Sequence, residues 1–193
     1  MPADLAARWP LPDHDSLRDE LLAAYGTGRG YHDLRHLAEV LDRLDDLGCD
    51  DDVVRLAAWF HDAVYEGRPG DEERSAQWAE RALPADLGPA VARLVRVTER
   101  HDPAADDEPG RLLCDADLAI LAAPADRYAD YAADVRADFA HVSDADFVAG
   151  RGAILAELLS RPALFATQRA RDLWEDAARD NVAAELARLR DAP

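Results

Sequence analysis

The chain has 193 residues, 49% of them hydrophobic, so it is long enough to bury one well-filled core. Its 22 basic and 40 acidic residues give a formal net charge of −18, which repels nucleic acid and makes a nucleic-acid partner unfavourable. We find no membrane-spanning apolar run, no signal peptide and no paired spacing of the two cysteines, which together predict a cytoplasmic protein with reduced thiols and no membrane partner.

Helical periodicity runs along most of the chain. Alanine, leucine, arginine and the acidic residues dominate, which favours helices, and no segment shows the alternation of a strand. We expect helices over 15–25, 34–47, 52–64, 72–83, 89–100, 111–121, 124–142, 144–161 and 168–189. The sequence therefore predicts an all-α fold, with one domain over residues 1–193. Its core would cover about 31–122, with C-terminal helices of about 124–190 packed on it.

Three polar clusters interrupt these apolar helices. The first is YHDLRH at 31–36, the second is His61-Asp62 in AAWFHDAVYEG, and the third is CDADL at 114–118. Imidazole and carboxylate groups together suit divalent ions that accept mixed nitrogen and oxygen donors. Each side chain alone also has a structural interpretation, such as a helix cap or a hydrogen-bonded histidine. The ordered set favours one metal site, whose predicted ligands are His36, His61, Asp62 and Asp117.

The ion at this predicted site is a divalent metal whose identity the sequence leaves open. Mn²⁺, Fe²⁺, Co²⁺, Ni²⁺, Zn²⁺ and Mg²⁺ are candidates, and Ca²⁺ fits less well because it prefers more oxygen donors. His32 lies four residues before His36 at the start of a helix, so both imidazoles can face one side.

The order His36, His61-Asp62 and Asp117 resembles the HD-domain superfamily of metal-dependent phosphohydrolases. From about residue 9 to residue 189 the chain is similar to a small bacterial group described only as predicted HD-superfamily phosphohydrolases. The strings that carry this similarity are YHDLRH, AAWFHDAVYEG, DEERSA, VTERH, DADLAIL and GRGAILAELLSR…WEDAARDNVAAEL. The resemblance implies an HD-type helical bundle with a metal site between its central helices. It also implies hydrolysis of a phosphate ester of a nucleotide or another small molecule.

The string YHDLRH is also similar to the YHNxxH string of cyclic-nucleotide phosphodiesterases, with Asp33 in place of asparagine. That similarity implies that His36 is a metal ligand and His32 a general acid for the leaving group. A divalent ion would activate the attacking water, and Asp62 or Asp117 could orient that water. Arg35 is either a clamp for the substrate phosphate or a surface partner of an acidic neighbour.

Several roles stay open at the level of sequence. His101 could bind a second metal, contact phosphate or merely end a helix, and Asp115 ranks behind Asp117 as a ligand. Glu72 and Glu73 either line the pocket or favour a helix N-terminus. The loop GTGRG at 26–30 is either a flap over the substrate or a plain turn. Arginines of the C-terminal region either face the pocket or tie helices together, namely Arg136, Arg151 and Arg179.

Two other functions are compatible with the same motifs. A di-iron oxygenase would need extra histidine ligands, for which only His32 and His101 are available. A non-catalytic sensor of a metal or nucleotide would be expected to have a damaged ligand set, whereas this set is whole. The sequence fixes neither the substrate nor the oligomeric state.

Overall fold

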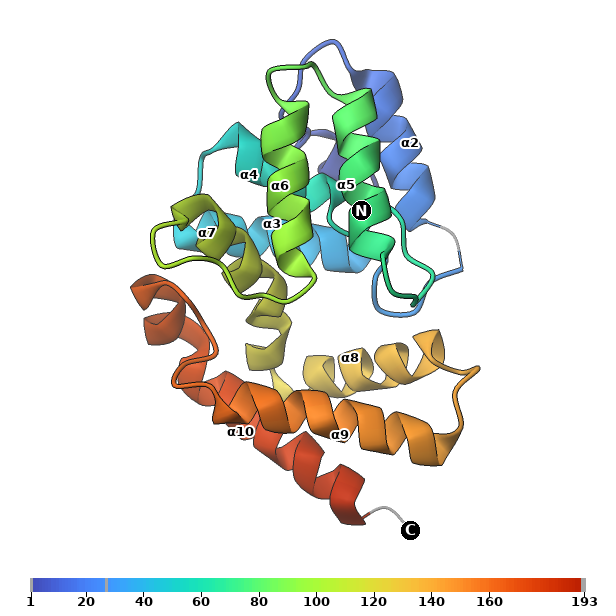
Figure 1. Cartoon of the computed structure of the whole chain (residues 1–193), viewed down its shortest axis with the longest axis vertical. Coiled ribbons are helices and arrows are strands. Elements are labelled where there is room, and N and C mark those ends of the chain that lie inside the picture. The colour runs from blue at the N-terminus through green and yellow to red at the C-terminus, as the bar shows by residue number, and fades with distance from the viewer. Residues whose placement is uncertain (1, 27, 192–193) are drawn as a thin grey trace. The chain divides into compact units, whose positions relative to one another are not determined.

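A computed structural model describes residues 2–26 and 28–191, and these residues form ten α-helices, one 3-10 helix and no strand (Figure 1). The predicted all-α fold is confirmed. The elements are α1 (Pro2–Ala6), α2 (Asp15–Tyr25), α3 (Leu34–Leu47), α4 (Asp52–Phe60), α5 (Asp71–Ala82), α6 (Gly88–Thr98), α7 (Glu108–Leu118), η1 (Ala119–Ala122), α8 (Ala125–Asp138), α9 (Asp144–Ser160) and α10 (Gln168–Asp191).

The chain divides into two compact units, Met1–Asp117 and Leu118–Pro193. Every residue of the predicted metal site belongs to the first unit. The prediction of one domain with its C-terminal helices packed on the core stays a prediction. Among the described residues, no helix combines the length and the apolar character that crossing a bilayer requires.

Local signals set the bounds of α3, which agree with the prediction. The Asp33 side chain accepts hydrogen bonds from the backbone N–H groups of Arg35 (2.8 Å) and His36 (3.1 Å), so it caps the first turn. Gly48 ends the helix in the left-handed region, with φ of +75°. The cap therefore places His36 in the first turn, on the same side as the buried residues Leu37, Val40, Leu41 and Leu44.

Helix α4 is shorter than predicted, because the predicted segment continued to Val64 and the helix ends at Phe60. The His61 Nδ1 atom lies 2.7 Å from the carbonyl oxygen of Ala58, which the amide of Asp62 would use in a continuing helix. That amide instead donates to the Tyr25 hydroxyl (3.2 Å). The His61-Asp62 pair therefore lies at the start of an irregular turn rather than inside a helix.

Other bounds differ from the prediction at helix ends. Helix α7 begins earlier because Asp107 accepts from the amide of Gly110 (3.2 Å), and it changes to the 3-10 helix η1 after Leu118. Helix α8 ends at Asp138 rather than 142, and the Arg136 guanidinium donates to the carbonyl oxygens of Phe139 and Val142. The short helix α1 was not predicted.

Helices α5 and α6 lie side by side in the first unit (Figure 1). Small side chains make this close packing possible, and both helices also contact α4, whose residues 56–60 are almost fully buried. The buried residues of the two helices include Ala76 and Ala79 on α5 and Val91, Ala92 and Val95 on α6. The packing fixes α4, and hence the turn that follows it.

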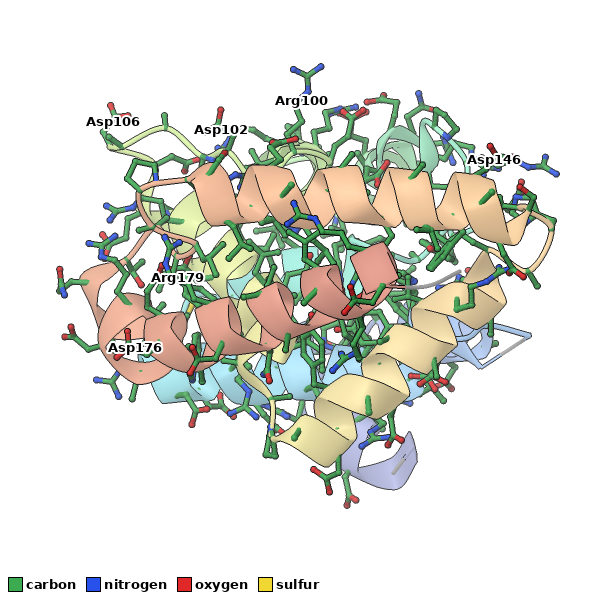
Figure 2. The ribbon with its side chains drawn as sticks, turned by 90° about the horizontal axis from the view of Figure 1, so that it is seen from below. Arg100, Asp102, Asp106, Asp146, Asp176 and Arg179 are labelled. Carbon is green, nitrogen blue, oxygen red and sulfur yellow. The ribbon has the colours of Figure 1, made fainter. Side chains whose placement is uncertain are left out.

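In the second unit, arginines tie helices together. The Arg151 guanidinium on α9 binds both carboxylate oxygens of the buried Glu185 on α10, at 2.8 and 3.1 Å. The Tyr128 hydroxyl on α8 donates to the same carboxylate (2.5 Å). Arg179, labelled on α10 in Figure 2, donates to Glu175 and to the carbonyl oxygens of Leu159 and Arg161. Arg136 likewise bonds backbone carbonyls, so all three arginines have structural partners.

Candidate metal centre

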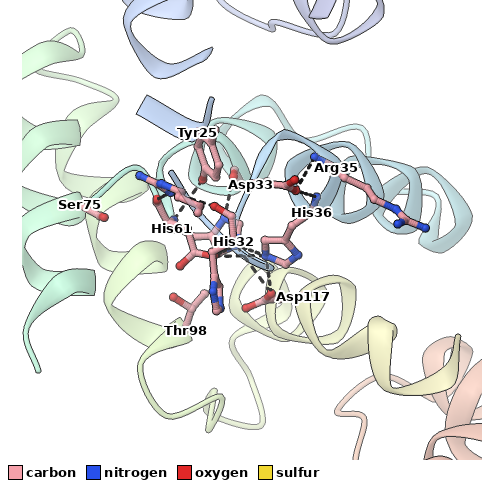
Figure 3. A network of polar contacts seen from close by, with 12 residues as sticks. Tyr25, His32, Asp33, Arg35, His36, His61, Ser75, Thr98 and Asp117 are labelled. Carbon is pink, nitrogen blue, oxygen red and sulfur yellow. Dashed lines mark hydrogen bonds and ion pairs between the residues drawn. The ribbon is translucent and has the colours of Figure 1, made fainter. Parts of the chain in front are cut away.

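Two imidazoles and two carboxylates meet in the first unit (Figure 3). His36 comes from the first turn of α3, His61 and Asp62 from the end of α4, and Asp117 from the last turn of α7. The Nε2 atoms of His36 and His61 lie 2.9 Å apart. The Asp62 Oδ2 atom lies 3.3 Å from the Nε2 atom of His36 and 3.1 Å from that of His61. The Asp117 Oδ1 atom lies 3.2 Å from the Nε2 atom of His36 and 3.7 Å from that of His61.

These separations fit the donors of one transition-metal ion. Donor atoms bound at about 2.1 Å lie about 3.0 Å apart at right angles and about 3.4 Å apart at the tetrahedral angle. The measured separations span 2.9 to 3.7 Å. One donor atom each from His36, His61 and Asp117 lies within 4.8 Å of the others, and Asp62 adds a second carboxylate beside them. The structure thus brings His36, His61 and Asp117 into one group, with Asp62 against the two imidazoles, and the role of all four as ligands stays a prediction.

The hydrogen bond of His61 to Ala58 determines which ring nitrogen can bind an ion. A carbonyl oxygen only accepts, so the Nδ1 atom of His61 carries the proton of that 2.7 Å contact. In the neutral ring the Nε2 atom then has a lone pair, which faces His36 and the two aspartates. A backbone partner of this kind is the usual way in which a metal-binding histidine is oriented.

Burial and charge act against each other in this cluster. His36 and His61 are each 1% exposed, and burial alone would lower the pKa of an imidazole. Hydrogen bonds to Asp117 and Asp62 outweigh that effect and raise the pKa of His36 to about 10. Burial would raise the pKa of the Asp62 carboxyl, but the neighbouring His61 and His32 hold it well below its usual range. In the metal-free protein, a proton on His36 therefore offsets part of the charge of the aspartates.

The turn after α4 is held by side chains from three other segments. The Arg29 guanidinium donates to the carbonyl oxygens of Asp62 (2.5 Å) and Ala63 (2.8 Å). The same group donates to the carbonyl of His32 (3.0 Å), so it joins the two histidine clusters. Tyr25 accepts from the amide of Asp62, and the Ser75 hydroxyl bonds both the amide (3.0 Å) and the carbonyl (3.3 Å) of Val64.

These partners satisfy backbone groups that the end of the helix leaves without helical bonds. The sequence gives no local signal that Arg29, Tyr25 or Ser75 meets this turn, because all three come from other segments. Arg29 also anchors one end of the loop 26–30 to the turn. Thr27 of that loop lies outside the described residues.

His32 and Arg35 have different surroundings. The His32 ring stacks on Tyr65, with centroids 3.8 Å apart, and its centroid lies 5.8 Å from that of His36. His32 is half-buried beside the cluster. The side chain of Arg35 is 46% exposed, its Nε atom donates to Glu39 (3.2 Å), and Figure 3 shows it extending away from His36 and Asp117. A role for Arg35 as a phosphate clamp stays a prediction.

The residues whose roles the sequence left open differ in burial and in their contacts. Glu73 is exposed and bonds Arg96 (2.6 and 2.9 Å), which is a surface ion pair. Glu72 is half-buried, and burial raises the pKa of its carboxyl, helped by the charges of Asp62 and Glu99. Asp115 is buried on α7. His101 contacts the cluster directly, since its Nε2 atom is 2.7 Å from the Oδ2 atom of Asp117.

Comparison with known proteins found no matching family model, no matching curated protein and no matching solved structure. The similarity to HD-domain proteins therefore rests on the sequence motifs alone.

Arg29→Met should weaken both the turn and metal binding. The substitution leaves three carbonyl oxygens without their charged donor, so the free energy of unfolding should fall by roughly 2–5 kcal/mol. Metal affinity should fall about 10-fold to 100-fold, as for other residues that orient ligands.

Chemical denaturation and calorimetric titration with Co²⁺ measure the two effects. Arg43→Met, which removes an exposed ion pair with Asp46, is the control and should change neither appreciably. Wild-type affinity in Arg29→Met would contradict the prediction.

Metal binding should release protons near neutral pH. Because the pKa of His36 is raised to about 10 in the metal-free protein, an ion must displace a proton there. By the same linkage, the contribution of His36 to metal-free stability is present below its ordinary pKa of 6.5 and lost as pH rises through about 10. Titration calorimetry at about pH 7.5, in buffers of different ionisation enthalpy, should show about one proton or more released per ion. Affinity that does not change with pH would argue against proton displacement.

Proposed function

We propose that the first unit is a metal-dependent phosphohydrolase that cleaves a phosphate ester of a nucleotide or another small molecule. The observation that carries the proposal is the meeting of two imidazole nitrogens and two carboxylates at separations that suit one divalent ion. The choice of phosphate esters rests on the motif similarity, since the donor set alone serves several kinds of hydrolysis.

His36, His61, Asp62 and Asp117 would hold the ion. When bound, a divalent ion activates water at neutral pH and offsets negative charge on the phosphoryl oxygens. A local cation matters here because the net charge of −18 would otherwise repel an anionic substrate. Asp62 is suited to orient the attacking water, because its carboxyl stays ionised and its backbone is fixed by Arg29 and Tyr25.

The surroundings of His32 support a role for it as the proton donor to the leaving oxygen. Its ring is next to His36 but is held by stacking on Tyr65, so it can face a substrate without being a ligand. It is also half-buried, which leaves part of the ring accessible to a substrate. Proton donation of this kind matters most when the leaving group is a poor one.

The main test combines metal dependence with loss of one ligand. Purified protein should hydrolyse at least one of p-nitrophenyl phosphate, bis(p-nitrophenyl) phosphate or a nucleoside monophosphate when Mn²⁺, Co²⁺, Ni²⁺ or Mg²⁺ is added, and a chelator should abolish turnover. Asp62→Ala should lose metal and turnover while keeping its helical circular dichroism. Asp46→Asn, an exposed carboxylate on α3, is the matched control and should keep both.

Three outcomes would contradict the proposal. Full turnover without metal or in Asp62→Ala would remove the ion from the mechanism. Metal binding with no turnover of any ester would favour the sensor. Two bound irons with consumption of oxygen would favour the oxygenase.

A second test separates His32 from His36. His36→Ala should lose the ion, because a donor atom has gone from the cluster. His32→Ala should keep the ion and lose roughly 10²–10⁴-fold in rate on an alkyl phosphate, with a smaller loss on a nitrophenyl ester that needs no proton. Metal stoichiometry and rates on both kinds of ester provide the readout. Loss of metal in His32→Ala would instead make His32 a ligand.

A further inference from the structure

The two carboxylate oxygens of Asp117 face different partners. The Oδ1 atom lies 3.2 Å from the Nε2 atom of His36 and 3.7 Å from that of His61, within the candidate metal site. The Oδ2 atom lies 2.7 Å from the Nε2 atom of His101, which is outside the predicted ligand set. The carboxylate is only 14% exposed, so these neighbours largely define its surroundings.

The contact with His101 is a hydrogen bond in which the imidazole donates. A carboxylate oxygen only accepts, so the Nε2 atom of His101 carries the proton. Its length of 2.7 Å is that of a charge-assisted hydrogen bond. The contact therefore occupies Oδ2 with a hydrogen bond from His101.

The backbone adopts an unfavourable conformation at His101. Its φ of +48° lies in the left-handed region, where among the described non-glycine residues only Asp13 accompanies it. The residue follows α6, and its amide donates to the carbonyl of Val97 (3.1 Å). Figure 2 shows the exposed neighbours Arg100 and Asp102 pointing outward. The imidazole of His101 instead contacts the carboxylate of Asp117. Glycine and asparagine are common at such a turn, and the imidazole at this position adds a contact with Asp117 that neither would make in the same way.

We propose that His101 is a positioning residue that holds Asp117 through Oδ2 and so leaves Oδ1 for the divalent ion. The inference rests on the proposed metal site but not on the reaction that the site performs. It has a consequence for ion selectivity. A carboxylate that offers a single oxygen suits four- to six-coordinate ions and disfavours Ca²⁺, which takes more oxygen donors and often binds both oxygens of one carboxylate.

Two substitutions at position 101 form a matched pair for the test. His101→Gln keeps an N–H donor at similar reach, whereas His101→Leu keeps comparable bulk and removes the donor. Each variant and the wild type are titrated with Co²⁺, and the visible absorption of the bound ion is recorded, because that spectrum reports the ligand geometry. Circular dichroism of the metal-free proteins shows whether the helices are intact.

His101→Leu should bind Co²⁺ about 10-fold to 100-fold more weakly than the wild type, with an altered spectrum, and should discriminate less against Ca²⁺. His101→Gln should stay within a few-fold of the wild-type affinity and keep the spectrum. Equal binding and equal spectra in wild type and His101→Leu would overturn the inference. So would a loss in His101→Gln as large as that in His101→Leu, or a fall from two bound ions in wild type to one in His101→Leu.

A measurement on the wild type avoids any dependence on how the variants fold. In the Zn²⁺-loaded protein, the ¹⁵N shifts of His101 should show an Nε2 atom that still carries its proton. An unprotonated, metal-bound Nε2 atom would make His101 a ligand and overturn the inference. If the wild type binds Co²⁺ but hydrolyses no phosphate ester, the proposed function fails and the inference stands. If the wild type binds no divalent ion, both fail.

Discussion

The carboxylates of Asp62 and Asp117 lie against the buried imidazoles of His36 and His61. Such a cluster needs positive charge to offset the two carboxylates. Isolated buried carboxylates are costly, so Asp62 and Asp117 need positive charge beside them. In the metal-free protein a proton on His36 supplies part of it, because hydrogen bonds to Asp117 and Asp62 raise the pKa of His36 to about 10. A divalent ion at the proposed site would bring a larger positive charge between the same groups. A local cation also matters because the net charge of −18 repels anions.

The cluster depends on a helix that stops at the right residue. Inside a continuous helix His61 and Asp62 would diverge by roughly 100°. The His61 imidazole instead donates a hydrogen bond to the carbonyl oxygen of Ala58. The chain leaves the helix at Asp62, whose backbone N–H donates to the Tyr25 hydroxyl. The freed carbonyls of the turn are bonded by Arg29. One side chain therefore acts twice, because His61 both ends the helix and directs its Nε2 atom toward the cluster.

Each of three proposed ligands is held by a partner outside the ligand set. Ala58 orients His61, Arg29 fixes the backbone of Asp62, and His101 occupies one oxygen of Asp117. Each contact restricts the motion of a ligand side chain or its backbone before an ion binds, so less conformational entropy is lost on binding. A preorganised set of this kind is suited to an ion that keeps positions open for water and substrate.

Local signals in the sequence determined the helical class, the bounds of α2 and α3, and four candidate donors. The cap at Asp33 and the glycine at 48 act on their own helix, so they can be read without knowing the fold. The end of α4 could not be predicted, because Tyr25, Arg29 and Ser75 reach it from distant segments. His101 stayed ambiguous for the same reason, since its partner lies 16 residues away. Residue type and spacing limit which groups can bind an ion, whereas only tertiary packing decided which atoms meet and how each is held.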